Sequence, residues 1–174
     1  MTRQGSSAPA QPFACGTRRI EESWANVIGH MRAHQYVALF DDAMMAFLSG
    51  SSLTDGTLRN GTTSPVLTDM HVCYLKEVRP GEEVAFFAQA LGHDERRGRV
   101  MLTMQAAPAG WLAATCELAI INLDLRTRRP CPWSAEQMAT WQRLANEHAG
   151  LPHPPQAGRG IGAINPVQDR HASS

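Results

Sequence analysis

Acidic side chains inside otherwise apolar segments are the first places in this sequence where chemistry is expected. Asp42 interrupts the apolar residues 33–48, and Asp69 and Glu117 interrupt two later apolar runs. A carboxylate in such a place has to be paired, protonated or exposed through a gap, and two of those outcomes are typical of functional sites. We therefore treat Asp42 and Asp69 as candidate catalytic acids and Glu117 as a candidate substrate-binding acid. For Asp69 and Glu117 the alternative is an edge position or a structural ion pair.

A second group of polar residues precedes residues 33–48. Gly29 gives the backbone freedom at this point, and the free N–H groups of a first helical turn can hold an anion or an acyl oxygen. His30, taken alone, is more often a helix-start histidine than a catalyst, but its place in the order Gly29-His30-Met31 makes it a candidate catalytic residue. Asn26 is an ordinary loop residue in many sequences, because its side chain bonds local N–H groups.

Residues 33–48 are predicted to form the central helix of the molecule. They contain neither glycine nor proline and carry apolar side chains on almost every face. A helix that is apolar all round must be wrapped by other elements. Gly50 and the serines around it are expected to end the helix, and Asp41 is expected to be the exposed member of its pair with Asp42.

The rest of the chain is predicted to be mostly strands that pack against this helix. One helix on one antiparallel sheet is an α+β fold. Asp69 and His71 share a strand face, because side chains two residues apart point the same way, although His71 is expected to be structural. Ser134, with Gln137 three residues later, predicts a capped helix to about His148. The expected strands are residues 18–24, 66–75, 83–91, 99–105 and 112–125.

Composition limits the classes of function. The 174 residues suggest a single domain, and 16 basic against 16 acidic residues leave a net charge of zero, which disfavours nucleic acid as a partner. The four cysteines form no C-x-x-C pair, so we expect no metal site and a reducing cytoplasm. No apolar run approaches the roughly 20 residues that cross a bilayer, so no membrane contact is expected.

Both ends of the chain are expected to lie outside the folded domain. Residues 1–16 are rich in Gly, Ser, Pro and Ala, which bury too little apolar surface to offset the entropy of ordering, so we expect a disordered tail. Residues 151–174 are rich in Pro and Gly and are expected to be extended. The domain itself is predicted to span residues 17–150.

The segment before the central helix resembles the opening motif of hotdog-fold acyl-CoA thioesterases. That motif reads D-x-x-G-H-[MV]-x-x-x-x-Y, and Asn26, Gly29, His30, Met31 and Tyr36 stand at its positions here. The resemblance covers about residues 20–162. Three further segments resemble one smaller group within these thioesterases. That group is the thioesterases of carnitine catabolism, whose activity is hydrolysis of betainyl-CoA. The three segments are Thr68-Asp69-Met70-His71, Ala113-Ala114-Thr115-Cys116-Glu117 and the ending from Leu151 to Gly162.

The resemblance implies hydrolysis of a short acyl-CoA in a pocket formed across a subunit interface, with coenzyme A entering only as part of the substrate and with no cofactor. A homodimer or a dimer of dimers follows from it. Gly29 and Met31 would polarise the thioester carbonyl. Arg128, with Arg126 and Arg129, would meet coenzyme A phosphates, although a solvated charge cluster is the alternative. Trp24, Tyr36 or Phe40 would face a quaternary ammonium group.

The sequence departs from the family's pattern at two positions. Asn26 stands where the family has its catalytic aspartate, and an amide has no ionised form to act as nucleophile or base. It would orient a water or donate to the thioester oxygen. Asp69 stands where the carnitine-linked members have a glutamate, which reaches about one methylene further.

Two other functions stay open at this point. Asn26 also suits a hotdog protein that binds acyl-CoA, or serves as a scaffold, without catalysis. A hotdog hydratase ranks last, because the D-x-N-x-x-H pattern typical of hydratases of this fold is absent.

Overall fold

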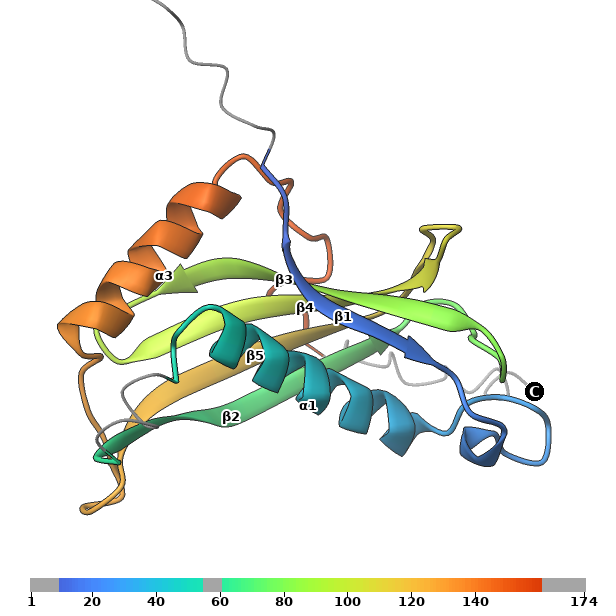
Figure 1. Ribbon diagram of the computed structural model, residues 1–174, viewed down its shortest axis with the longest axis horizontal. Coiled ribbons are helices and arrows are strands. Elements are labelled where there is room, and N and C mark those ends of the chain that lie inside the picture. The colour runs from blue at the N-terminus through green and yellow to red at the C-terminus, as the bar shows by residue number, and fades with distance from the viewer. Residues whose placement is uncertain (1–9, 55–60, 161–174) are drawn as a thin grey trace, which may run out of the picture.

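The computed structural model describes residues 10–54 and 61–160, which form one curved antiparallel sheet with a long helix on one face (Figure 1). The sheet order is β1-β3-β4-β5-β2, and a short β6 pairs with β5. The α+β hotdog architecture predicted from the sequence is thereby confirmed. The elements are β1 (Phe13–Arg19), the 3-10 helix η1 (Glu22–Trp24), α1 (Ala33–Gly50), β2 (Thr63–Tyr74), β3 (Glu83–His93), β4 (Arg97–Ala107), β5 (Leu112–Asp124), β6 (Arg129–Pro130) and α3 (Ala135–His148).

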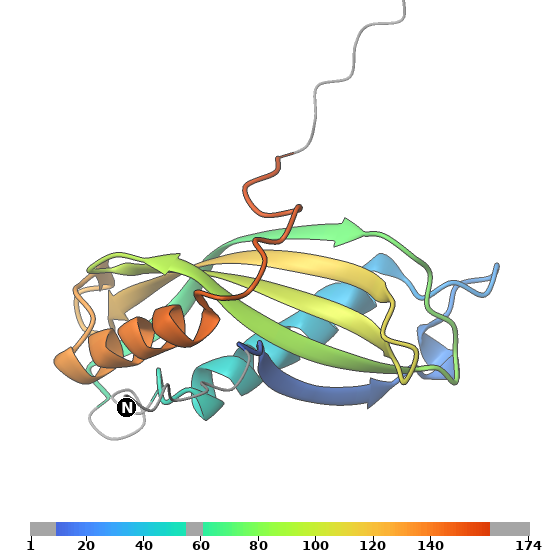
Figure 2. The ribbon, with the colours of Figure 1, turned by 90° about the horizontal axis from the view of Figure 1, so that it is seen from above.

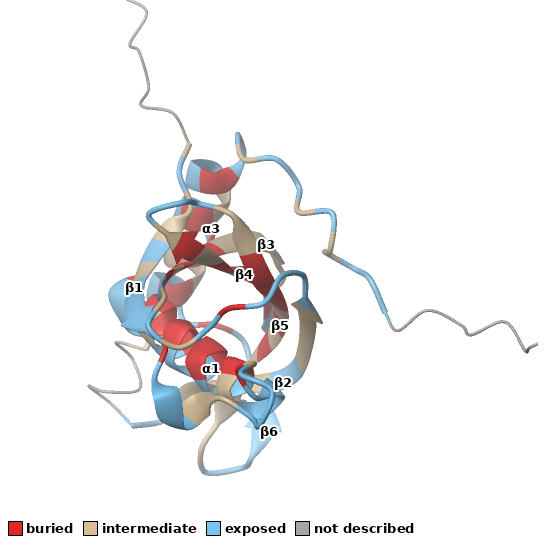
Figure 3. Cartoon of the chain, turned by 90° about the vertical axis from the view of Figure 1, so that its right-hand side faces the viewer, coloured by how far each residue is buried: buried red, intermediate tan, exposed pale blue. Residues whose placement is uncertain are grey.

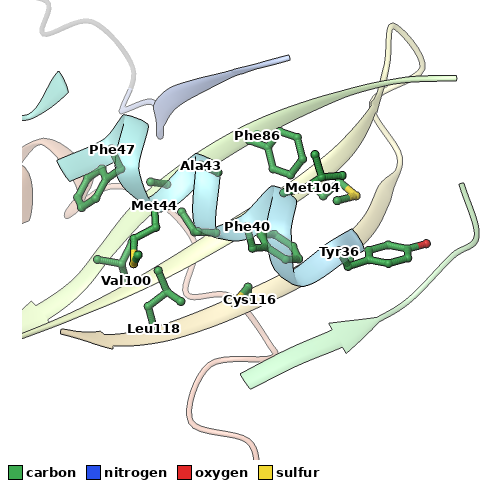
Figure 4. Packing of buried hydrophobic residues seen from close by; sticks show 14 of the residues in the cluster. Tyr36, Phe40, Ala43, Met44, Phe47, Phe86, Val100, Met104, Cys116 and Leu118 are labelled. Carbon is green, nitrogen blue, oxygen red and sulfur yellow. The ribbon is translucent and has the colours of Figure 1, made fainter. Parts of the chain in front are cut away.

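Helix α1 is held to the sheet by one apolar stripe, as Figures 3 and 4 show. The stripe follows the three- and four-residue spacing of a helix face, so every member points at the sheet. Phe40 lies edge-on to Phe86 of β3, with ring centroids 5.9 Å apart. The buried members of the stripe are Tyr36, Leu39, Phe40, Ala43, Met44, Phe47 and Leu48.

The expectation that α1 is apolar on all faces and wrapped all round is wrong. Its outward face exposes Val37 and Met45 together with both aspartates, Asp41 and Asp42. A single stripe already covers the inner face of the sheet, so Val37 and Met45 stay exposed among the described residues.

Alternation along the strands separates the two faces of the sheet. Toward α1, strands β4 and β5 present buried apolar residues such as Leu102 and Leu118. The neighbouring positions point to the opposite face, which we call the outer face. Asp69, Arg99 and Glu117 occupy such outward positions, since their register partners alternate with the core residues.

The first strand begins earlier than predicted, and this overturns the expectation of an unstructured tail through residue 16. Strand β1 starts at Phe13 and ends at Arg19, and residues 22–24 of the expected strand form the 3-10 helix η1 instead. The ring of Phe13 packs edge-on against Phe47 of α1, with centroids 5.5 Å apart. A side chain at Gly50 would come within 2.7 Å of that ring. The glycine at the end of α1 therefore leaves the space that the Phe13 ring occupies. Residues 1–9 lie outside the described part of the chain.

Helix α3 follows the sequence prediction closely. Ser134 accepts from the Gln137 N–H and Gln137 in turn accepts from the Ser134 N–H, which completes the predicted capping box. Trp141 of this helix lies directly over Gly98 of β4, where any side chain would clash with the indole. His148 ends the helix, and its Nδ1 accepts from the Ala90 N–H at 2.9 Å.

Residues 151–160 leave α3 and cross the outer face of the sheet (Figure 2). We call them the C-terminal strap. Gln89 of β3 donates to the Pro152 carbonyl, and the Gly158 N–H donates to Glu117 of β5. Met101, an outward residue of β4, is only 1% exposed. The expectation of an extended tail outside the folded domain is therefore wrong for residues 151–160, which include a turn at 155–158 and are bonded to the sheet; residues 161–174 lie outside the described part.

Phe13→Ala is expected to destabilise the protein by about 1–3 kcal/mol, less than the full cost of a completely buried phenylalanine, because Phe13 is only half-buried. Denaturant unfolding measures the change. Gln11→Ala, at an exposed position just before β1, is the matched control and should stay within about 0.5 kcal/mol of the parent. Equal stability of the two variants would contradict the anchoring role of Phe13.

Candidate functional site

A tight loop before α1 carries the residues of the motif. The chain doubles back so that Ala25 and Met31 form a bridge, and the Asn26 N–H donates to the His30 carbonyl at 2.8 Å. Gly29 turns the loop with φ +82°, a conformation that favours glycine. Val27, at the tip, is fully exposed.

The side chain of Asn26 shapes this loop. Its Oδ1 accepts from the Ile28 N–H at 3.0 Å and from the His30 N–H at 3.1 Å. Two backbone donors therefore converge on one oxygen, and this is the local role foreseen for an ordinary loop asparagine. The Nδ2 group makes no hydrogen bond with the described residues, so it is free to donate to a bound molecule.

Helix α1 starts next to this loop with its N–H groups uncapped. The N-cap residue is Arg32, which has no side-chain hydrogen bond to the helix, and no acid lies in the first turn. The guanidinium of Arg32 instead turns back and donates to the carbonyls of Ser23 and Trp24. The positive end of the helix dipole is therefore available to an anion or an acyl oxygen.

A cleft of about 210 Å³ opens at this end of α1. It brings together three predicted site residues, His30, Met31 and Tyr36, with two that sequence reasoning missed, Tyr74 and Glu77. The rings of Tyr36 and Tyr74 meet edge-on, with centroids 5.1 Å apart. Nothing in the local pattern distinguishes Tyr74 and Glu77, because they reach the cleft only through the pairing of β2. The remaining lining residues are Ala33 and Val78.

The charged pair in the cleft is His30 with Glu77. His30 Nε2 lies 3.3 Å from Glu77 Oε2, and both side chains are partly exposed. Burial raises the pKa of Tyr36; a backbone hydrogen bond with Val78 opposes this rise, and the negative charge of Glu77 adds to it. The Tyr36 phenol therefore stays protonated and neutral at physiological pH.

The structure places Asp69 and Glu117 on the outer face of the sheet, away from this cleft. Glu117 is 13% exposed at its side chain and forms an ion pair with Arg99, whose Nε lies 3.1 Å away. Burial raises the pKa of Glu117, but the Arg99 contact, the Gly158 N–H and the nearby His71 outweigh it, so the net pKa is lowered. The structural ion pair, which was the alternative for Glu117, is present.

Asp69 is exposed and lines a separate hollow of about 310 Å³ beside His71, Arg99 and Arg159. Because it points away from α1, it does not meet Asn26 or His30 within one chain. A role for Asp69 in catalysis stays a prediction that this geometry does not favour.

Asp42 and Arg128 also lie apart from the cleft. Asp42 is on the outward face of α1, with a side chain that is 63% exposed and 3.9 Å from Arg18 of β1. The expected burial that made Asp42 a candidate is absent. Arg128 is exposed in the turn between β5 and β6, at the far end of β5 from Ala114, the register partner of Tyr74.

The two remaining aromatic candidates differ in access. Phe40 is completely buried in the core and cannot face a ligand. Trp24 is half-buried in η1, and its carbonyl accepts from the Arg32 N–H at 3.0 Å.

The described residues contain no cluster of three or more His, Cys, Asp or Glu side chains that could hold a metal ion. Neither helix in the described ranges is long and apolar enough to cross a membrane.

Residues 20–141 match the family model of the thioesterase-like superfamily. The chain belongs to this superfamily. The match spans the motif loop, α1, strands β2 to β6 and the start of α3, and it confirms the expected resemblance to thioesterases.

Two curated relatives have betainyl-CoA thioesterase in their names. The betainyl-CoA thioesterase of Pseudomonas aeruginosa is 30% identical over 146 residues, which cover 83% of this chain and 91% of that one. The L-carnitine dehydrogenase/betainyl-CoA thioesterase of Rhizobium meliloti is 29% identical over 151 residues, 87% of this chain. The chain spans about a third of the length of that second protein, since the match covers 30% of it.

Solved structures agree with the thioesterase fold. A Staphylococcus aureus protein in complex with CoA superposes with a TM-score of 0.81 at 19% identity, over 92% of this chain and all of that one. A 1,4-dihydroxy-2-naphthoyl-CoA thioesterase from Synechocystis gives a TM-score of 0.63 at 16% identity, over 83% of this chain and all of that one.

Proposed function

We propose that this thioesterase hydrolyses a short acyl-CoA whose acyl group carries a quaternary ammonium, as in betainyl-CoA, in the cleft at the start of α1. The observation that carries the proposal is the juxtaposition of an uncapped helix N-terminus with the Tyr36–Tyr74 ring pair in one cleft. The names of the two betainyl-CoA thioesterase relatives support the choice of acyl group.

Each part of the cleft has a chemical role in this proposal. The first-turn N–H groups of α1 and the Asn26 amide stabilise the negative charge that develops on the thioester oxygen. The faces of Tyr36 and Tyr74 attract the cationic acyl group. The nucleophile is water, so coenzyme A enters only as part of the substrate and no metal or cofactor takes part. A cytoplasmic location suits the four cysteines, which are all free thiols.

We further propose that a second copy of the chain completes the site. Strand β2 lies at the end of the sheet order, with no described strand on its other edge. Exposed apolar residues gather near that edge and the motif loop: Val27, Ile28, Tyr74 and Leu75. A homodimer, or a dimer of dimers, would cover them and close the cleft.

The first test is thiol release from a panel of short acyl-CoAs. Betainyl-CoA is compared with 3,3-dimethylbutyryl-CoA, which has the same shape and a carbon in place of the charged nitrogen. A cation–π contribution of about 0.5–2 kcal/mol predicts a roughly 2- to 30-fold preference in kcat/KM for the charged ester. No thiol from any ester, despite measurable binding, would favour an acyl-CoA-binding or scaffolding protein instead.

The second prediction concerns Asn26→Asp. The loop should be unchanged, because a carboxylate oxygen can accept the same Ile28 and His30 N–H groups. The second oxygen places a base at the motif position, and we expect kcat to rise, with about 10²–10⁴ as the full contribution of a positioned base. Asn146→Asp, the same change at an exposed position of α3, is the control. An unchanged kcat in Asn26→Asp would contradict the assignment of the motif loop to the site, and a fall would show that the Asn26 amide acts as a donor to the thioester oxygen.

The third prediction concerns assembly. Light scattering should give twice the 19.0 kDa of one chain, or four times for a dimer of dimers. Leu75→Asp places a charge at the end of β2, where Leu75 is 45% exposed, and should raise the monomer fraction. A monodisperse monomer at 19.0 kDa for the parent protein would contradict the shared site.

A further inference from the structure

We infer that His30 and Glu77 supply the base that this chain lacks at Asn26. In this inference His30 removes the proton from the attacking water, and Glu77 is the positioning residue that holds the imidazole. The inference rests on the proposed function, because it assigns the base of that same thioester hydrolysis.

The contact between the two side chains fixes their roles. An ionised carboxylate only accepts hydrogen bonds, so Glu77 Oε2, which lies 3.3 Å from His30 Nε2, favours a ring proton on Nε2. In that tautomer Nδ1 carries the lone pair, and Nδ1 makes no hydrogen bond with the described residues. A histidine base oriented by a carboxylate on its second nitrogen is a general arrangement for activating a nucleophile.

Among the residues that the structure describes, Glu77 is the only carboxylate that lines the cleft. Arg32 could compete for Glu77 and Glu82 could compete for His30, but both have other partners. Arg32 donates to the Ser23 and Trp24 carbonyls, and Glu82 accepts from the Arg79 N–H at 2.7 Å. The other titratable groups facing His30 across the cleft are the phenols of Tyr36 and Tyr74, and burial raises the pKa of Tyr36.

The chemical step balances with water alone. As the water oxygen bonds to the thioester carbonyl carbon, its proton passes to His30 Nδ1, and Glu77 stabilises the imidazolium that forms. The negative charge on the carbonyl oxygen faces the free N–H groups at the start of α1. The C–S bond then breaks, the imidazolium returns the proton to the thiolate of coenzyme A, and the acyl group leaves as the carboxylic acid.

Substitutions in this pair can change activity without changing stability, because partly exposed ion pairs contribute little to folding. Glu77→Gln and His30→Gln should both keep the melting temperature of the parent. Glu83→Gln, which removes an exposed carboxylate outside the cleft, is the matched control and should keep the activity as well.

Rates are measured with betainyl-CoA and its neutral isostere across a range of pH. We expect His30→Gln to lower kcat on the order of 10²-fold and to remove the acid limb of the pH profile. Glu77→Gln should lower kcat by about 10-fold for both esters alike and move the acid limb to lower pH, because the imidazolium loses its counter-charge. Glu77→Asp should recover part of the rate.

Two results would overturn the inference. Unchanged kcat in Glu77→Gln would remove Glu77 from the reaction. A rise in KM for betainyl-CoA alone, with the neutral isostere unaffected, would make Glu77 a counter-ion of the acyl group instead. Failure of the proposed function is recognised separately, since the parent protein would then release no thiol from any ester.

Discussion

The apolar stripe of α1 packed on the inner face of the sheet is the constraint on which the rest of the structure depends. Burying a large apolar side chain such as Phe40 or Phe47 contributes about 1.5–3 kcal/mol, and the stripe buries several together. Because the stripe fixes how the helix is rotated, Asp42 must face outward. The same contact fixes the register of the strands, and alternation then sends Asp69 and Glu117 to the outer face. The loop before α1 is set neither by the rotation of the helix nor by the alternation along the strands, and the cleft opens beside it.

The loop before α1 shows how a chain can lose a charged group and keep its geometry. One oxygen of the Asn26 side chain closes the loop on two backbone donors, and that task needs an acceptor rather than a charge. The amide therefore leaves the fold intact while it removes a negative charge from the positive end of the helix. An unneutralised helix end favours bound anions and developing oxyanions more strongly than one with a carboxylate beside it.

The sequence was sufficient for elements whose signal is local. Periodicity located α1 and the four long strands to within a few residues, and Ser134 with Gln137 located the start of α3. Burial of Asp42 was predicted wrongly, because composition alone cannot tell which helix face meets the sheet. The local sequence does not show that Phe13 is folded, because its partner Phe47 is remote in sequence. The sequence does not indicate Glu77 either, because only the folding of β2 against β5 brings this residue to His30.

Two of the three segments that resemble carnitine-linked thioesterases lie in contact with each other in the structure. The segment ending at Glu117 and the segment around Gly158 are separated by some forty residues, yet they meet in one contact, in which the Gly158 N–H donates to Glu117 Oε2 at 2.6 Å. Gly158 has φ +73°, so a side chain there would be strained. Glu117 keeps its charge through Arg99 and holds the strap across the outer face. These two segments therefore describe how the sheet is covered, and the chemistry is left to the loop and cleft on its other side.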